Sequence, residues 1–466
     1  MTIAELPWTL LFFADLLAAA AVTVHVLLRK RNPTSAAAWI GLAWFAPWVG
    51  APLYLALGIN RVERRARRLK RRPGAAGDAA APLILDPPHL APLDVAMTRI
   101  TNRPCLPGAA VEILGGGDAA YPQMLAAIER ATVSVALTSY IFKADQVGER
   151  FIKALSDAHA RGVAVRTLID GVGGGVLSAP AWRRLRETGS PVERFLHAAL
   201  PWRMPLLNLR SHRKLLIVDG AEAFVGGLNI SAENVSEPDL KTRDTHFRVA
   251  GPVVAQAMAA FVADWSFTTE EELAGPAWFP ALQSQGGSLA RLVTSGPDHE
   301  LERIKAVLMC AIGAATRRIR IQTPYFIPDE LMSAALRLAA LRGVDVMIVI
   351  PSRSDWRPLD WAMADGLVPL LASGCRIHRS PPPFDHSKLT TVDGIWCLVG
   401  SSNWDQRSLR LNFELDLEIR DAALAEALDR RIEDAAGSPI TLRELSGRSL
   451  PTRLRDATAR LASPYL

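Results

Sequence analysis

Cysteine is scarce in this chain of 466 residues, and the four that occur form no CxxC pair and no zinc-ligand spacing (Cys105, Cys310, Cys375 and Cys397). A secreted fold held together by disulfides is therefore not indicated. The chain also lacks GxxxxGK[ST] and has no GxGxxG after a strand, so the usual nucleotide-binding signatures are missing. Its 32 glycines and 32 prolines follow no period, which excludes a collagen-like or low-complexity chain.

What is present is a composition that supports a folded core. Apolar residues make up 49% of the sequence and charged residues 21%, and a chain of this length has room for two or three domains. The net charge of +6 is small, because 53 basic residues face 47 acidic ones. The basic excess is local: the run NRVERRARRLKRR places eight basic residues between Arg61 and Arg72.

Two long apolar stretches precede this basic run, Trp8–Leu28 and Ser35–Ile59. Each has the roughly 20 residues needed to cross a bilayer, so the sequence predicts two transmembrane helices. Pro47 and Pro52 leave open a kinked or re-entrant second helix. Two buried core helices are the alternative, and a cleaved signal peptide fits poorly because no basic segment precedes the first stretch.

The basic run also predicts an orientation. The N-terminus has no Lys or Arg before the first apolar stretch, and the connecting turn has three. The positive-inside bias therefore places everything after residue 60, and the N-terminus as well, in the cytoplasm. We expect residues 1–72 to form a transmembrane hairpin with a basic collar, and the Ala-, Pro- and Gly-rich residues 73–105 to form a linker.

The rest of the chain reads as one unit written twice. Segments 131–142 and 315–327 both read as a strand that ends in aromatic residues, and each is followed by a helical pattern, RGV and another strand. This order predicts a parallel βαβ unit in each half. We expect domains at 106–275 and 276–466. The apolar positions of the two predicted helices are Phe151, Leu155 and Ala158 in the first half and Leu331, Ala335 and Leu338 in the second.

Each half then carries the same constellation at the same offsets from a histidine, 2, 7, 14 and 17 residues. The residues are His212, Lys214, Asp219, Gly226 and Asn229 in the first half and His386, Lys388, Asp393, Gly400 and Asn403 in the second. Residues two apart on a strand share a face, so His and Lys should project together. The Asp-Gly pairs predict hairpin turns, after which the next strand returns the Asn to the His and Lys.

This duplication predicts one site built from two facing half-sites. The chemistry that suits two His, two Lys and two Asn is attack on a phosphodiester, because cations and amide donors hold its oxygens. One imidazole can attack phosphorus, and the other can protonate the leaving alkoxide. No residue spacing suggests a magnesium or zinc site, so we expect no metal and no other cofactor.

The paired HxK(x)4D pattern, followed by GGLN and GSSN, resembles the phospholipase D superfamily. Other segments are similar to the membrane-anchored bacterial cardiolipin synthases, from about residue 29 to about 435. They are RNPTSAAAW with P-x-x-G-x-x-L-Y-L-x-x-G at 47–58, NLRSHRK at 208–214, RDTHFRVAGP at 243–252, QTPYFIPDE at 322–330 and GSSNWDQRSLRLNFE at 400–414. The resemblance implies an α/β fold of two fused phospholipase D-like sandwich domains related by pseudo-twofold symmetry, after two transmembrane helices.

The resemblance also implies roles for individual residues. His212 would be the nucleophile and His386 the general acid and then base, while Lys214, Lys388, Asn229 and Asn403 would hold phosphate oxygens. Glu414, 28 residues after His386, and Asp244, 32 residues after His212, would each fix an imidazole. Ser401, where the first copy has Gly227, could donate a further hydrogen bond to phosphate. Asp219 and Asp393 complete the two catalytic motifs, and their place at the turns favours a structural role.

The implied activity is a phosphatidyl transfer that joins two phosphatidylglycerols into cardiolipin and releases glycerol, at the bacterial inner membrane with the catalytic part in the cytoplasm. A phospholipase D type hydrolase is the alternative, and the second lipid could instead be phosphatidylethanolamine. The implied partners are phospholipids and the bilayer. No nucleic acid is expected, because the basic residues cluster at the membrane edge. Arg407 and Arg410 either assist the anionic substrate or pair with Glu414 and Asp416.

Overall fold

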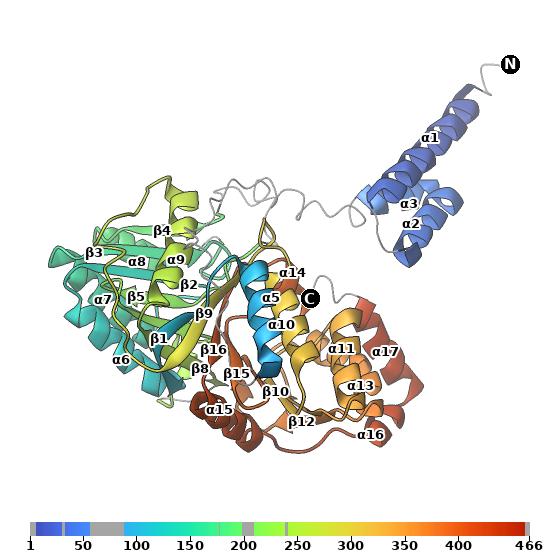
Figure 1. Ribbon diagram of the computed structural model, residues 1–466. Helices are drawn as coiled ribbons and strands as arrows, with labels where there is room; N and C mark the ends of the chain where they lie inside the picture. Colours follow the sequence, from blue (N-terminus) through green and yellow to red (C-terminus); the bar gives the residue numbers. More distant parts are fainter. Residues whose placement is uncertain are drawn as a thin grey trace. The chain divides into compact units, whose positions relative to one another are not determined.

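The computed structural model describes residues 6–29, 33–55, 88–176, 178–197, 209–237 and 241–461. The chain divides into two compact units, Met1–Arg65 and Ala66–Leu466 (Figure 1). The predicted basic collar at 61–72 and the first part of the predicted linker lie outside the described residues.

The N-terminal unit consists of three helices, α1 (Leu6–Arg29), α2 (Pro33–Phe45) and α3 (Pro47–Leu53). Among the described residues, only α1 is long and apolar enough to cross a membrane. The second apolar stretch breaks at Ala46, because Pro47 has no N–H to continue the helix. The prediction of two spanning helices is therefore not confirmed. Tyr54, directly after α3, is linked to α1, since its hydroxyl lies 2.7 Å from Nδ1 of His25.

The second unit begins earlier than the sequence predicted. Within the presumed linker, Pro88–Leu90 form a 3-10 turn, η2, and Ala91–Thr101 form helix α5. Leu93 and Met97 are buried and pack with residues of α10 (Arg303–Ala314) in one apolar core. This part of the linker prediction was wrong, because apolar residues at helical spacing were outweighed by the prolines and alanines around them.

The centre of the second unit is a 14-stranded sheet in which two halves repeat the same strand order. From the middle outward, the first half contributes β1 (Leu106–Gly115), β8 (Thr245–Ala250), β6 (Glu222–Gly226), β5 (Leu215–Val218), β2 (Ser134–Ser139), β3 (Ala164–Asp170) and β4 (Val192–Phe195). The second half contributes β9 (Ser288–Ser295), β16 (Glu414–Arg420), β15 (Trp396–Gly400), β14 (Leu389–Val392), β10 (Arg318–Gln322), β11 (Asp345–Pro351) and β12 (Arg376–Ser380). Strands β1 and β9 pair antiparallel at the centre, as a pseudo-twofold axis requires.

Helices cover both faces of this sheet (Figure 1). The predicted βαβ units are present, since β2, β3 and β4 are mutually parallel and so are β10, β11 and β12. In the first half the helices are α6 (Gly117–Arg130), α7 (Gln146–Ala160), α8 (Pro180–Glu187), the 3-10 turn η4 (Ala232–Asn234) and α9 (Val254–Thr269). In the second they are α10, α11 (Glu330–Leu341), α12 (Arg357–Gly366), α13 (Val368–Ala372), α14 (Gln406–Arg410), α15 (Ala422–Asp434), α16 (Leu442–Ser446) and α17 (Leu450–Leu461).

Three apolar cores result, and the middle one joins the halves. It contains Val225 and Phe247 from the first half together with Val399 and Leu415 from the second. The predicted division at residue 275 falls between α9 and β9, in the connection between the halves. Because they share a core and a sheet, the halves form one compact unit.

The buried face of α11 differs from the prediction. Met332, Leu336 and Ala339 face the core, whereas Leu331 and Leu338 are 61% and 57% exposed. Both sets of positions have the spacing of a helix face, so the pattern could not select between them. The corresponding helix α7 was predicted correctly, because its apolar residues occupy one face only.

The motif aspartates lie in the predicted turns, with φ of 50° at Asp219 and 55° at Asp393. Asp219 accepts hydrogen bonds from the backbone N–H groups of residues 132–134, and Asp393 from those of residues 316–318. Each carboxylate thus ties the turn to the beginning of the neighbouring strand, β2 or β10. Neither lines the central cavity described below, so both fit a structural role.

We predict that Asp393→Asn lowers the free energy of unfolding by about 3 kcal/mol, because a fully buried carboxylate that accepts several backbone N–H bonds is replaced by a group with one acceptor oxygen. Urea unfolding of the purified protein in detergent measures this. Asp365→Asn is the control, since its ion pair with Arg460 is exposed and should contribute under about 1 kcal/mol. Equal effects in the two variants would contradict the structural role of Asp393.

Candidate active site

Each motif histidine is positioned by backbone of the opposite half. His212 follows a bridge between Ser211 and Phe413, and its N–H donates to the carbonyl of Phe413 over 2.8 Å. His386 follows the short strand β13 (Phe384–Asp385), which pairs in parallel with β7 (Thr242–Arg243). Its N–H donates to the Arg243 carbonyl, also over 2.8 Å. The two copies therefore hold each other's histidines in register.

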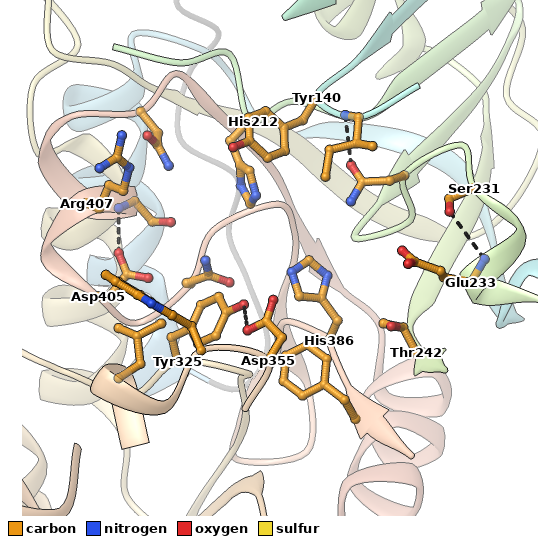
Figure 2. A pocket seen from close by; sticks show the side chains of 18 of the residues that line it. Tyr140, His212, Ser231, Glu233, Thr242, Tyr325, Asp355, His386, Asp405 and Arg407 are labelled. Atoms are coloured by element: carbon orange, nitrogen blue, oxygen red, sulfur yellow. Dashed lines mark hydrogen bonds between the residues drawn. The ribbon is translucent and has the colours of Figure 1, made fainter. Parts of the chain in front are cut away.

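The two imidazoles face each other across one cavity (Figure 2). Their ring centroids are 6.4 Å apart and their planes are inclined by 78°. Both line a cavity of about 890 Å³, within the size range of small-molecule sites. A single phosphate group placed between the two rings would be within reach of both. The structure thus brings together the two histidines that the duplicated motif singled out.

A buried carboxylate holds each imidazole, and it comes from the other half. Nδ1 of His212 lies 3.0 Å from Oε2 of Glu414, and Nδ1 of His386 lies 2.8 Å from Oδ2 of Asp244. With Nδ1 occupied in both rings, Nε2 is left for the cavity. The sequence indicated the two carboxylates but not their crossed pairing, because an offset along the chain does not show which half a side chain faces.

The difference between Gly227 and Ser401 follows from the different lengths of these carboxylates. A Cβ at Gly227 would lie 2.1 Å from Oδ1 of Asp244, so the shorter acid excludes any side chain there. In the second copy the Ser401 hydroxyl donates to Glu414 over 2.5 Å. Ser401 is fully buried and does not line the cavity. Its predicted contact with phosphate was therefore wrong, and its hydrogen bond holds Glu414 instead.

The two motif lysines lie beneath the imidazoles. Nζ of Lys214 donates to the carbonyl of His212 over 2.7 Å and lies 5.2 Å from the ring centroid of Tyr140. Nζ of Lys388 contacts the carbonyl of His386 and lies 2.6 Å from its Nδ1. Neither lines the main cavity, and both are buried. They place two positive charges behind the pair of rings.

Burial dominates the electrostatics of the site. Burial, together with the charge of Lys388, lowers the pKa of Lys214 to about 7, and burial lowers the pKa of Lys388 to about 8. Burial and the two lysines also lower the pKa of both imidazoles, that of His212 to well below 6.5. Both rings are thus neutral at pH 7. Burial has the largest single effect on Asp244 and opposes its ionisation, but Lys388, His386 and the N–H of Thr245 together outweigh it, so the pKa of Asp244 is lowered.

The two predicted asparagines, Asn229 and Asn403, both line the cavity. Oδ1 of Asn229 accepts a hydrogen bond from the backbone N–H of Ile141 over 3.2 Å, which leaves its amide N–H groups as donors. Asn403 is 5% exposed. Both amides come after the strands β6 and β15 that follow the predicted turns, so the returning strand delivers them as expected.

The sequence did not single out several other groups near the site. Asp170 is buried and accepts hydrogen bonds from the N–H groups of Val172, Gly173 and Ser211, so it fixes the backbone just before His212. Asp355 and Asp405 line the cavity. The signal that could have indicated Asp170 is its position at the end of β3, where parallel strands gather polar side chains.

His246, two residues after Asp244, lies outside the cavity. It is 1% exposed, and burial lowers its pKa to about 4. The two tyrosines that end equivalent strands, Tyr140 and Tyr325, do line the cavity. Of the two arginines, Arg407 lines it as well, whereas Arg410 pairs with Glu302 and not with the acids expected from sequence.

A duplicated α/β sheet that brings two His-x-Lys motifs to one cavity defines the phospholipase D type of fold. Comparison with solved structures agrees: the phosphatidylserine synthase of Haemophilus influenzae Rd KW20 matches with a TM-score of 0.63 at 15% identity, over 80% of this chain and 100% of that one. The family model "Cardiolipin synthase, PLD-like domain" matches residues 124–265 and 308–435, and a phospholipase D-nuclease N-terminal model matches residues 17–58.

Proteins of similar sequence indicate which family within this fold the chain belongs to. The major cardiolipin synthase ClsA of Bacillus subtilis (strain 168) is 32% identical over 491 residues, covering 100% of both chains. Cardiolipin synthase A of Pseudomonas fluorescens (strain SBW25) is 36% identical over 375 residues, covering 80% of this chain and 78% of the relative. The chain belongs to the cardiolipin synthase family.

The lysine pKa values predict a titration that can be observed directly. Because burial lowers these pKa values, Lys214 should lose its proton as the pH rises through about 7 and Lys388 through about 8, while solvent-exposed lysines titrate near ~10.4. NMR of protein labelled with 13C at the lysine ε-carbon measures this, with Lys214→Met and Lys388→Met to assign the signals. If all lysine signals titrated above pH 9, the assigned burial of the two charges would be wrong.

Proposed function

We propose that the protein is a membrane-associated phosphatidyltransferase that makes cardiolipin from two phosphatidylglycerol molecules and releases glycerol. The observation that carries this proposal is the pair of imidazoles 6.4 Å apart, each held at Nδ1 by a buried carboxylate of the other half. Such a pair can attack phosphorus from one side and exchange a proton with the departing or arriving oxygen on the other. Family membership favours the synthase over a phospholipase D type hydrolase, which would use water as acceptor.

In the first half-reaction, we assign His212 as the nucleophile. Its depressed pKa keeps it neutral, and Glu414 holds the proton on Nδ1 so that Nε2 carries a free electron pair. Nε2 attacks the phosphorus of the first lipid, the P–N bond forms and the bond from phosphorus to the glycerol oxygen breaks. His386 gives its proton to that oxygen, and glycerol leaves a phosphatidyl-histidine.

His386 is suited to be the acid because its partner Asp244 has a lowered pKa and therefore stays ionised beside it. Burial and Lys388 lower the pKa of His386 in the empty site. A bound phosphodiester adds negative charge between the rings, which favours the protonated imidazole. Substrate binding thus supplies the charge that makes His386 an acid.

In the second half-reaction the roles reverse. His386, now neutral, takes the proton of a glycerol hydroxyl on the second phosphatidylglycerol. The hydroxyl oxygen bonds to phosphorus while the P–N bond breaks, which frees His212 and yields cardiolipin. One phosphodiester replaces another, so the reaction needs no nucleotide. Asn229 and Asn403, which line the cavity, would hold the non-bridging oxygens during both steps, and the charges of Lys214 and Lys388 behind the imidazoles would offset the negative charge of the phosphate.

The N-terminal unit fits attachment to a bilayer. Helix α1 is long enough to span it, and apolar side chains such as Phe12, Leu28 and Phe45 are 64%, 76% and 92% exposed within the unit. We further propose that the apolar segments enter the bacterial inner membrane as a multi-pass hairpin and that the basic run after them keeps the catalytic unit in the cytoplasm. The catalytic unit then stays close to lipids that do not leave the bilayer.

We predict that His212→Ala abolishes the covalent intermediate and lowers cardiolipin formation by at least roughly 10⁴-fold, whereas His386→Ala still forms the intermediate from a lipid with a p-nitrophenyl leaving group, since that group needs no proton. The experiment uses full-length protein, lipid with a 32P-labelled phosphate, and alkaline gels that preserve phosphoramidates. His159→Ala is the control. A labelled His212→Ala protein, or wild-type protein that yields only phosphatidic acid, would refute the proposal.

We predict that Glu414→Gln lowers kcat by roughly 10²–10⁴-fold with little change in KM, because the amide no longer fixes the tautomer and position of His212. Glu414 is here a positioning residue, so the kcat against KM comparison is the informative measurement. Ser401→Ala, which removes one hydrogen bond to Glu414, should have a smaller effect in the same direction. Glu426→Gln, at an exposed position of α15, is the matched control. An unchanged kcat in Glu414→Gln would contradict the assignment.

A further inference from the structure

The cavity is built by two copies of one fold, yet the groups that its two equivalent tyrosines contact differ in charge. Tyr140 and Tyr325 end the equivalent strands β2 and β10, and each approaches one imidazole, with ring centroids 5.0 Å from His212 and 6.3 Å from His386. The Tyr140 hydroxyl accepts a hydrogen bond from Arg210 over 2.7 Å. The Tyr325 hydroxyl donates instead to Asp355 over 2.6 Å (Figure 2).

A second arginine lies at the Tyr140 end. Arg407, from α14 of the second half, lines the cavity together with Arg210. Burial lowers the pKa of the Arg407 guanidinium, and the positive charge of Arg210 lowers it further. Two like charges that approach each other in a partly buried place are unfavourable. An anion between them would offset this repulsion.

Neither arginine has a counterpart in the other copy. The position two before the motif histidine is Arg210 in the first half and Phe384 in the second. The position four after the motif asparagine is Arg407 in the second half and Glu233 in the first, where Glu233 pairs with Lys143 over 2.8 Å. The twofold repeat therefore explains one phosphate between the histidines, but it does not explain a pair of arginines at one end.

Two carboxylates, Asp170 and Asp405, lie near the arginines and offset part of the charge of Arg407, and both also bind backbone N–H groups. Asp170 accepts three backbone N–H bonds, and Asp405 accepts the N–H of Ser408 at the beginning of α14. Among the described residues, the Arg210 guanidinium makes its hydrogen bond to Tyr140 and no ion pair. Its Nε is buried without a partner in the same part of the chain. Arg210 thus keeps donor capacity at this end of the cavity.

We propose that Arg210 and Arg407 form a second phosphodiester site, which holds the phosphate of the acceptor lipid that does not react. This rests on the proposed function, since only a phosphatidyl transfer to a second lipid brings two phosphates into the cavity at once. In the product a single glycerol bridges the two phosphates. Tyr140 connects the two sites, since its ring centroid lies 5.0 Å from that of His212 and its hydroxyl accepts the hydrogen bond from Arg210.

The arrangement also gives the acceptor a direction. Guanidinium groups bind phosphate oxygens in pairs, whereas Asp355 at the opposite end repels them. The acceptor would therefore enter with its phosphate at the Tyr140 end and its free glycerol hydroxyl toward the two imidazoles. Water and glycerol carry no phosphate, so they gain nothing from the arginines.

The test compares two acceptors with one variant. Full-length Arg407→Gln in phosphatidylglycerol vesicles should form cardiolipin roughly 10–100-fold more slowly than wild type, while it exchanges labelled glycerol into phosphatidylglycerol at a rate within about twofold of wild type. Phosphatidic acid should then rise relative to cardiolipin. Arg210→Gln should give the same pattern, and Arg407→Lys should restore part of the transfer. Arg410→Gln, on the same helix but paired with Glu302, is the matched control.

The outcomes separate this site from the proposed function. Selective loss of cardiolipin formation with glycerol exchange retained supports a site for the acceptor's phosphate. Equal loss of both activities would overturn it, because the arginines would then serve the reacting phosphate, and unchanged cardiolipin formation would overturn it as well. If wild-type protein made no cardiolipin and exchanged no glycerol, the phosphatidyl transfer itself would be refuted, and the second site with it.

Discussion

The crossed contacts between the two halves are the constraint on which the site depends. Glu414 of the second half holds His212 of the first, and Asp244 of the first half holds His386 of the second. Backbone hydrogen bonds run along the same crossed paths, from His212 to Phe413 and from His386 to Arg243. Neither half contains a complete set of groups around its own histidine. The shared core and the pairing of β1 with β9 exist, in this sense, to keep two incomplete sites together.

The same constraint explains how so many ionisable groups can be buried side by side. Two lysines and two imidazoles would repel one another if all were protonated, and isolated buried charges are costly. Burial leaves the imidazoles neutral, and two acids lie against them. A bound phosphodiester then brings negative charge between the rings, which protonation of His386 offsets. A phosphodiester is the ligand that such a site is ready to accept.

Much of the fold and of the site could be predicted from the sequence, because the second copy of the motif repeats the pattern of the first and so supports it. Two copies of one spacing predicted the repeated βαβ units, the turns at Asp219 and Asp393, and the meeting of His212 with His386. Three-dimensional information that no spacing carries was missed. Contacts between residues far apart in the sequence decide three such features. They are the crossed carboxylates, the buried hydroxyl of Ser401 and the face of α11 that is buried. The second apolar stretch was predicted to span, with a kink or re-entry left open at Pro47 and Pro52, because hydropathy averages over the break at Pro47.

The contact between Gly227 and Asp244 bears on how the two copies have diverged. A short acid fills the space that a side chain at position 227 would need, while in the other copy a longer acid is held by a serine at the matching place. Either combination holds the imidazole, but a serine beside the shorter acid would clash, and a glycine beside the longer acid would remove a hydrogen bond. A substitution at one of these positions is therefore unfavourable unless the other position changes as well. The asymmetry between the two copies is for this reason difficult to reverse by single substitutions.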